Sequence, residues 1–259
     1  MIHYVAVQLR DRLRVLDKAL RHGQPGSEEV LHDVRVAARR LLQAIRLFAD
    51  FLDARRVKQM RRRLRQLTER CGAVRDCDIA LAILAAAGCD DAEPREHITA
   101  LRQTRQDELS CHLRGRHSVQ RWRRFLVPLQ PSPRMVTAAA FAHRTLPRML
   151  DKLFASGAQA VADGTEPALH HFRLLAKRFR YTLELFAEVY GPGTQKCLHA
   201  LAALQDRLGA MQDCTASLTL TGHNPRIQRL LETRRRSFAQ YWKTFRKHHA
   251  SWKPWLNGD

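Results

Sequence analysis

The sequence predicts an all-α protein. Apolar residues recur with a helical period along almost the whole chain, and no convincing run alternates in the manner of a β-strand. Short segments rich in Gly, Pro, Asp and Ser interrupt this period. About ten helices, each roughly 10 to 25 residues long, fit between the interruptions. The interruptions fall at residues 22–27, 86–94, 127–133, 162–167, 191–193 and 221–225.

Several helix starts can be placed from these interruptions. Ser27 precedes two glutamates, Ser132 precedes a proline, and Thr165 precedes Glu166 and Pro167. Hydroxyl side chains favour the N-cap position, and acidic residues or proline suit the first turn. We therefore expect Ser27, Ser132 and Thr165 to cap helices.

The chain also contains a long internal duplication. The segment LHDVRVAARRLLQAIRLF (31–48) returns 138 positions later as LHHFRLLAKRFRYTLELF (169–186). The segment LRQLTERCGAVRDCDIAL (64–81) returns 137 positions later as LAALQDRLGAMQDCTASL (201–218). Such a repeat indicates two copies of a supersecondary unit, which we place at 1–127 and 134–259. The simplest arrangement is two pseudo-symmetric helical bundles around a shared basic surface.

The charge of the chain points to a polyanionic partner. Lys and Arg number 45 against 25 Asp and Glu, which gives a net charge of +20. A surplus of this size repels itself in the compact state, and a polyanion would relieve that repulsion. The alternative is that the protein comes from a generally basic proteome.

In the first copy, cations gather on one side of a helix. At about 100° per residue, His32, Arg35, Arg39 and Arg46 fall on one side, with Arg40 at the flank. The opposite side is apolar and is predicted to be buried; it comprises Val34, Leu41, Ile45, Phe48 and Leu52.

Two further helix faces are basic. In the first copy, Met60, Leu64 and Leu67 lie opposite a face that holds Lys58, Arg61, Arg62 and Arg65. In the second copy, Phe172, Phe179, Leu183 and Phe186 lie opposite a stripe of His170, Arg173, Lys177 and Arg180, with Arg178 at the flank. Residues 31–75 hold 13 Lys and Arg but only four Asp and Glu. Like charges at this spacing destabilise a helix by a few tenths of a kcal/mol per pair, which favours a ligand surface over a solvated charged face.

The residue types in these stripes suit phosphate. The planar guanidinium of arginine binds phosphate oxygens in a bidentate manner, and a row of guanidinium groups at helical spacing suits a linear chain of phosphates. The leading histidines would add a hydrogen bond or a proton-dependent contact. We expect affinity to rise as pH falls through about 6.5, the ordinary pKa of histidine.

At these residues the chain resembles the CHAD family, the conserved histidine α-helical domain. The motifs are HDVRVAARRL with GAVRDCDIAL in the first copy and HHFRLLAKRFRYTLELF with LQDRLGAMQDC in the second. The resemblance implies a single domain over 1–259 made of two four-helix-bundle-like halves. It also implies binding of inorganic polyphosphate along a basic surface, often at polyphosphate granules.

The resemblance also assigns site residues. The family's histidine falls on His32 and His170, its first arginine on Arg35 and Arg173, and the basic pair that follows on Arg39, Arg40, Lys177 and Arg178. Arg180 matches a further basic position, where the first copy has Leu42. Either the first copy makes one contact fewer, or a neighbour such as Arg62 supplies it. The ExExK signature of the CYTH domains that accompany some members is missing, so no triphosphate-processing activity is carried over.

Two other classes of function remain open. A nucleic-acid binder would use the same basic surface and would stack bases on Trp122, Tyr241, Trp242 and Trp252, although packing is the favoured role of the aromatic residues in 101–125 and 226–255. An enzyme acting on polyphosphate would need carboxylates to hold Mg²⁺, for which Asp76, Asp78 and Asp213 are the best candidates. We interpret these as helix caps or ion-pair partners of Arg75 and its neighbours, so we expect a binder with no catalytic residue, metal site or cofactor.

The sequence also indicates the cellular setting. The six cysteines show no CxxC pair or zinc-type spacing and read as reduced thiols. No apolar run is long enough to span a membrane, and residues 1–16 do not resemble a signal peptide. We expect a cytoplasmic protein at polyphosphate granules, with no membrane partner and nucleic acid only as a secondary partner.

Overall fold

The chain divides into two compact units. The structure is a computed structural model that describes residues 1–21, 27–89, 91–116, 137–249 and 251–258. Unit 1 comprises Met1–Met135 and unit 2 comprises Val136–Asp259. Within the described residues every regular element is helical, which confirms the all-α prediction. The expected boundary at 127–133 and the expected cap Ser132 lie outside the described residues.

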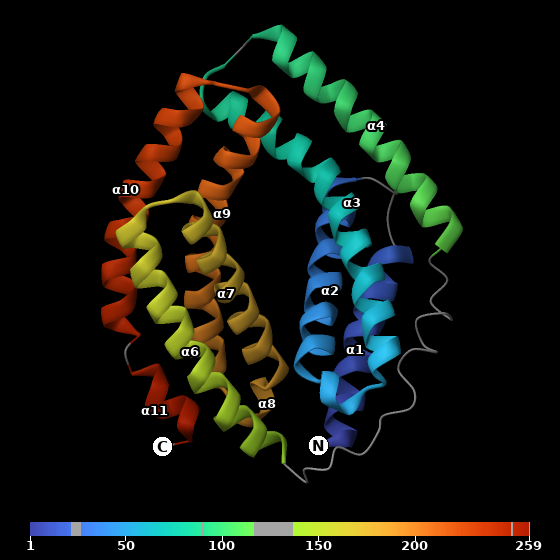
Figure 1. The fold of residues 1–259 in the computed structure, drawn as a ribbon, viewed down its shortest axis with the longest axis vertical. Helices are drawn as coiled ribbons and strands as arrows, with labels where there is room; N and C mark the ends of the chain where they lie inside the picture. Colours follow the sequence, from blue (N-terminus) through green and yellow to red (C-terminus); the bar gives the residue numbers. More distant parts are fainter. Residues whose placement is uncertain (22–26, 90, 117–136, 250, 259) are drawn as a thin grey trace. The chain divides into compact units, whose positions relative to one another are not determined.

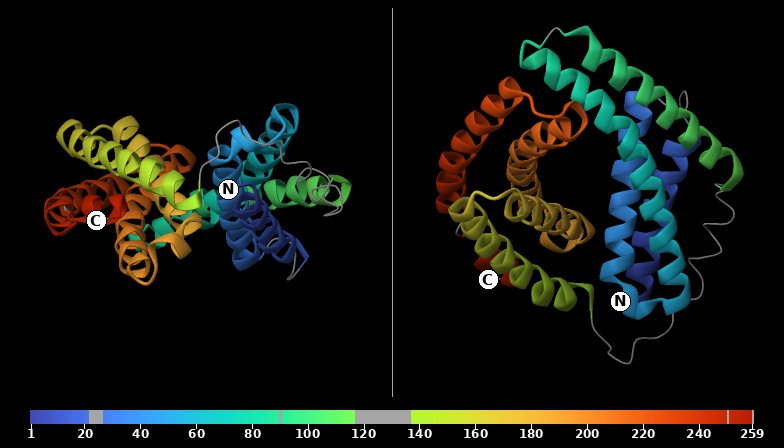
Figure 2. Two further views of the ribbon diagram at one scale, coloured as in Figure 1. Left: turned by 90° about the horizontal axis from the view of Figure 1, so that it is seen from below. Right: turned by 45° about the horizontal axis from the view of Figure 1, so that its top comes forward.

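Unit 1 is built from four long helices. They are α1 (Ile2–Arg21), α2 (Glu28–Leu47), α3 (Ala54–Ala86) and α4 (Ala92–Arg116), with a short 3₁₀ helix η1 (Ala49–Phe51) before α3. Each long helix packs against the next one in the chain (Figure 1). Figure 2 (right) shows α4 running back beside α3.

Unit 2 has the same order of long helices. They are α6 (Ala138–Asp163), α7 (Glu166–Leu185), α9 (Gly193–Thr221) and α10 (Pro225–His248). The short helix α8 (Ala187–Tyr190) lies between α7 and α9, and the short helix α11 (Trp252–Asn257) follows α10. Consecutive long helices pack together, and both α10 and α11 pack against α6. The fourth long helix therefore returns to the first and closes the bundle.

Side-chain caps fix several helix starts. Ser27 is the N-cap of α2, and its hydroxyl accepts a hydrogen bond from the Val30 N–H. Asp53 caps α3 by accepting from the Arg56 N–H at 2.8 Å. Thr165 occupies the N-cap of α7, where its side chain makes no capping bond. Gly164, which precedes it, ends α6 with a left-handed φ of 62° that glycine adopts without strain.

Two helices are longer than the sequence predicted. α3 has 33 residues and continues through Gly72, and α9 has 29 residues and continues through Gly209. A glycine inside a helix costs only about 1 kcal/mol. In α3 the buried apolar face continues on both sides of Gly72, from Leu67 to Val74, and this packing holds the helix together.

Candidate anion-binding faces

The first basic stripe lies along α2, opposite the buried face of that helix. Val34, Leu41, Ile45 and Phe48 are buried as predicted, whereas Leu52 is half-buried and lies beyond the end of α2. His32 is exposed, and the cations of the stripe are half-buried. These cations are Arg35, Arg39, Arg40 and Arg46.

Arg35 extends from α2 across the adjacent helix. Its Cζ atom lies 4.0 Å from the place where a Cβ on Gly72 would stand. Burial, followed by the charge of Arg39, lowers the pKa of Arg35 to about 10, against an opposing effect of Asp76. Its buried Nη1 makes no hydrogen bond. A cation held in this way gains stability from any anion that reaches it.

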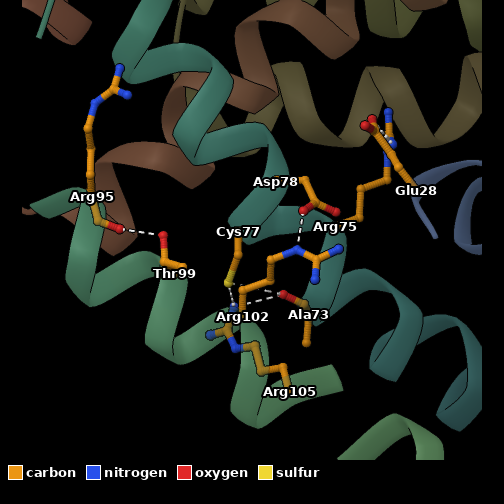
Figure 3. Close-up of polar contacts among 9 residues, drawn as sticks. All are labelled: Glu28, Ala73, Arg75, Cys77, Asp78, Arg95, Thr99, Arg102 and Arg105. Atoms are coloured by element: carbon orange, nitrogen blue, oxygen red, sulfur yellow. Dashed lines mark hydrogen bonds and ion pairs between the residues drawn. The ribbon is translucent and has the colours of Figure 1, made fainter. Parts of the chain in front are cut away.

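His32 lies among the same cations. Partial burial lowers its pKa below the ordinary value of 6.5, and the charges of Arg75, Arg35 and Arg39 lower it further, while Asp33 opposes them. The pKa of His32 in the free protein therefore lies below the ordinary value on which the expected pH dependence of affinity was based. Arg75 itself donates from Nη1 to Oε1 of Glu28 at 2.8 Å (Figure 3).

The acidic residues of α3 do not cap helices. Asp76 and Asp78 lie well inside α3, and Asp213 lies inside α9, so the interpretation as caps is wrong, because both helices continue through these positions. Asp78 pairs with Arg102 of α4 (Figure 3), and the partner of Arg75 is Glu28 rather than Asp76.

The remaining cations predicted in unit 1 line a cleft beside the first half of α3. The cleft has a volume of about 820 Å³. It is lined by Lys58, Arg61, Arg62 and Arg65, by Asp50 and Glu69, and by residues that include Ala49, Ala54 and Val57. The face opposite these cations is buried as predicted, with Met60, Leu64 and Leu67 in the core.

In unit 2 the matching stripe lies along α7. His170 and Arg178 are exposed, while Arg173, Lys177 and Arg180 are half-buried. The predicted opposite face is buried at Phe172, Phe179, Leu183 and Phe186. Nδ1 of His170 lies 2.8 Å from Oε1 of Gln212 on α9. An Nδ1–H that donates to this oxygen leaves Nε2 for a ligand.

The two stripes differ at their far ends. Glu184 stands where unit 1 has Arg46, and it lies 3.4 Å from Nε of Arg180. The guanidinium of Arg180 also lies over the ring of Tyr181. The charge of Arg180 is therefore partly neutralised within its own helix.

Each unit has one further arginine, outside the predicted set, that holds the third long helix beside the basic stripe. Nη1 of Arg105 on α4 donates to the Ala73 carbonyl at 2.8 Å and to Sγ of Cys77 at 3.2 Å (Figure 3). The donors and acceptors recur in unit 2, where Nη1 of Arg234 donates to the Ala210 carbonyl at 2.7 Å and to Sγ of Cys214 at 3.0 Å.

We call the contacts of Arg105 and those of Arg234 the arginine clamps. Each clamp holds the segment of the third long helix that lies beside the histidine of its unit, His32 or His170. In unit 1 the braced segment carries Arg75 and Asp76, and in unit 2 it carries Gln212 and Asp213. The matched cysteines were a visible signal in the sequence. Their arginine partners, Arg105 and Arg234, could not be predicted because they do not share the offset of the repeat.

The aromatic residues near the C-terminus mostly serve packing. Trp242, Phe238 and Phe245 are buried in unit 2, as the favoured interpretation of 226–255 predicted. The Tyr241 ring lies 4.2 Å from the guanidinium carbon of Arg207, and Trp252 packs against the Phe245 and His249 rings. Trp122 lies outside the described residues.

The cysteines of the chain are free thiols. All six cysteines fall within the described residues as thiols, and five of them are buried, with Cys111 exposed. The described part of the chain holds no group of three or more His, Cys, Asp or Glu side chains arranged to bind a metal ion. Among the same residues, no helix has both the length and the apolar character to cross a membrane.

Comparisons with known proteins identify the family. The family model of the CHAD domain matches residues 6–221, and no curated protein matches the chain. The crystal structure of the CHAD domain from the plant Ricinus communis is 21% identical and has a TM-score of 0.67, over 97% of this chain and 92% of that one. PptA from Streptomyces chartreusis is 18% identical with a TM-score of 0.66, over 95% of this chain and 96% of that one. These two structures share the fold of this chain. Because the family model spans most of the sequence, the chain belongs to the CHAD domain family.

Proposed function

We propose that this protein binds inorganic polyphosphate through the basic stripes of α2 and α7 and associates with polyphosphate granules. The observation that carries the proposal is the duplicated stripe. In each unit a histidine and several Arg or Lys side chains lie opposite the buried face of the second long helix. The resemblance to the CHAD family implies the same ligand.

The state of Arg35 supports an anionic ligand. Its guanidinium is half-buried next to other cations and keeps one Nη1 atom buried without a hydrogen-bond partner. A phosphate oxygen would supply both the missing acceptor and the missing negative charge, and arginine binds such oxygens in bidentate geometry. A repeating phosphate chain would offer one acceptor after another along the stripe.

The roles of the acids support binding without catalysis. Asp78 is held by Arg102, and Asp76 acts on the charge of Arg35. Both carboxylates therefore interact with cations of the protein. We propose that they set the positions and charges of these cations and hold no Mg²⁺.

Nucleic acid is the second candidate ligand, because its backbone is also a phosphate chain. Stacking of bases on aromatic side chains would then contribute to affinity. Trp242 is buried, and the rings of Tyr241 and Trp252 contact neighbouring side chains of unit 2. This arrangement favours polyphosphate over a ligand that needs stacking.

The test is a binding titration of long-chain polyphosphate, single-stranded DNA and single-stranded RNA at equal phosphate content and near-physiological salt. We expect polyphosphate to bind most tightly. The double variants Arg35→Ala/Arg39→Ala and Arg173→Ala/Lys177→Ala should each weaken polyphosphate binding by about tenfold or more, because charge-assisted contacts contribute roughly 1.5–3 kcal/mol each. The matched control removes two exposed cations of α10, by Lys243→Ala/Lys247→Ala.

Each result bears on the proposal. Equal binding of all three polymers, with equal losses in the control, would show a nonspecific polycation. Release of phosphate from polyphosphate by the purified protein with Mg²⁺ would contradict the proposal of a binder without catalysis. Association with granules is tested by the position of a fluorescently tagged protein relative to stained polyphosphate granules.

A further inference from the structure

The cleft beside α3 contains a group of cations that the second unit lacks. Lys58, Arg61, Arg62 and Arg65 line it. The positions 137 residues further on in the duplication hold residues that give no comparable group of cations. These are Gln195, Leu198, His199 and Ala202. The basic character of the cleft is therefore found in unit 1 and is not repeated in unit 2.

The cations of the cleft are available to a ligand. In the part of the chain that the structure describes, no ion pair joins any of the four to a carboxylate, although Asp50 and Glu69 also line the cleft. Lys58, Arg62 and Arg65 are exposed, whereas Arg61 is half-buried and its buried Nε has no hydrogen-bond partner. Four cations against two carboxylates leave a positive surplus that fits an anion.

The cations of the cleft lie on the same face of α3 as Gly72, the residue over which Arg35 extends from α2. At about 100° per residue, its four cations fall within about 100° of one another and of Gly72 and Asp76 on α3. Arg35 lies over Gly72. Lys58 lies 14 residues before Gly72 on the same helix, and at 1.5 Å per residue this corresponds to about 21 Å. One side of α3 thus joins two groups of cations at a fixed separation.

We infer that the α3 cleft is an anion subsite of unit 1 alone, and that it makes the protein select phosphate chains long enough to reach it from Arg35. This inference rests on the proposed function. A short anion such as tripolyphosphate occupies either Arg35 and its neighbours or the cleft. A long chain occupies both and gains the second set of contacts without a second loss of translational freedom.

The cleft also gives the two units unequal roles. In unit 2 the α7 stripe ends at the Arg180–Glu184 ion pair, and the matching part of α9 carries Gln195 where α3 has Lys58. Unit 1 offers a long basic track and unit 2 a short one. Most of the preference for long chains then comes from unit 1.

The test compares tripolyphosphate with long-chain polyphosphate on the full-length protein. The cleft variant is Lys58→Gln/Arg61→Gln/Arg62→Gln/Arg65→Gln, since glutamine keeps the helix propensity. The control has the same net charge but is changed on α10, at Arg229→Gln/Lys243→Gln/Arg246→Gln/Lys247→Gln, all exposed positions. Circular dichroism and thermal unfolding show whether each variant is folded.

In the cleft variant we expect the affinity for long chains to fall by about tenfold or more and the affinity for tripolyphosphate at Arg35 to persist. The slope of log affinity against log salt changes by about 0.7 per neutralised phosphate on single-stranded nucleic acid, so for long chains it should fall by up to about 3. The control should keep most of the preference for long chains.

Three outcomes would overturn the inference. They are an unchanged affinity of the cleft variant for long chains, an equal loss for long chains and tripolyphosphate, and an equal loss in the α10 control. Absence of polyphosphate binding by the wild-type protein would instead contradict the proposed function, so the two failures are distinguishable. If the quadruple variant does not fold, Lys58→Gln/Arg65→Gln, which changes only exposed side chains, gives the same comparison with a smaller expected loss.

Discussion

His32 and Arg35 lie one turn apart on α2, and the packing around them changes the pKa of both side chains. Both lie on α2 beside the segment of α3 that carries Arg75 and Asp76, and burial together with neighbouring cations lowers the pKa of each. The consequences differ because Arg35, with a pKa of about 10, stays charged at neutral pH. The lowered pKa of His32 favours its neutral form, and a bound anion would favour the charged form.

This difference predicts a pH dependence for binding. A bound phosphate stabilises the imidazolium and raises the pKa of His32, so binding takes up a proton and affinity rises as pH falls. Because the pKa of the free histidine is lowered, the rise should continue below pH 6.5. Titrations of polyphosphate binding between about pH 5 and 8 should show a shallower rise in His32→Gln than in the wild type. The exposed His97 on α4 provides the control His97→Gln, and identical pH profiles for the wild type and His32→Gln would remove His32 from the site.

At the scale of elements, the sequence predicts the buried face of a helix better than the ends of the helix or the residues that it contacts. The burial of Val34, Leu41, Phe172 and Phe179 followed from helical period alone, because a fixed rotation per residue determines which side chains share a face. The continuity of α3 through Gly72 could not be predicted, because packing on both sides of a glycine decides it and local propensity does not. The arginine clamps could not be predicted for a related reason, because residues in tertiary contact need no constant separation in the sequence.

The contact of α6 with α10 gives a prediction about stability. A Cβ on Gly157 would overlap the six-membered ring of Trp242 and lie 2.8 Å from Cζ of Phe172. Both rings are buried, with centroids 4.9 Å apart, so neither can move without disturbing the core. Gly157→Ala should lower the free energy of unfolding by about 1–3 kcal/mol, as overpacking does, measured by urea denaturation. Gly209 is the control, because a Cβ there meets nothing within 4 Å, and Gly209→Ala should leave stability unchanged or raise it by up to about 1 kcal/mol. Equal stabilities for the two variants would contradict the close packing at Gly157.

At the scale of the whole molecule, charge is the dominant property. The net charge of +20 predicted a polyanionic partner. The repeated motifs indicated the family. The sequence itself shows that the second stripe is less basic, because Glu184 stands where the first stripe has Arg46. The Arg180–Glu184 pair lies within one helix, whereas the cleft beside α3 exists only once the helices are packed and could not be predicted.

The same charge predicts an effect of salt on stability. Self-repulsion destabilises a compact chain, and salt screens it over about 10 Å at 0.1 M and about 3 Å at 1 M. Raising sodium chloride from low to high concentration should therefore raise Tm, by about 2–4 °C for each kcal/mol of repulsion removed. Polyphosphate added at equal ionic strength should raise Tm further, because it binds the folded state. A fall in Tm with added salt, measured by calorimetry, would contradict this account.

The arginine clamps also indicate where the fold tolerates changes in length. From Cys77 to Arg105 the chain covers 28 residues, whereas from Cys214 to Arg234 it covers only 20. The two units nevertheless make the same contact to a carbonyl and a thiol. The hairpin between the third and fourth long helices thus differs by eight residues (28 − 20) between the units, while the clamp is the same. An engineer who needs to insert a tag or a fluorescent reporter into this protein would choose the tip of that hairpin, between α3 and α4.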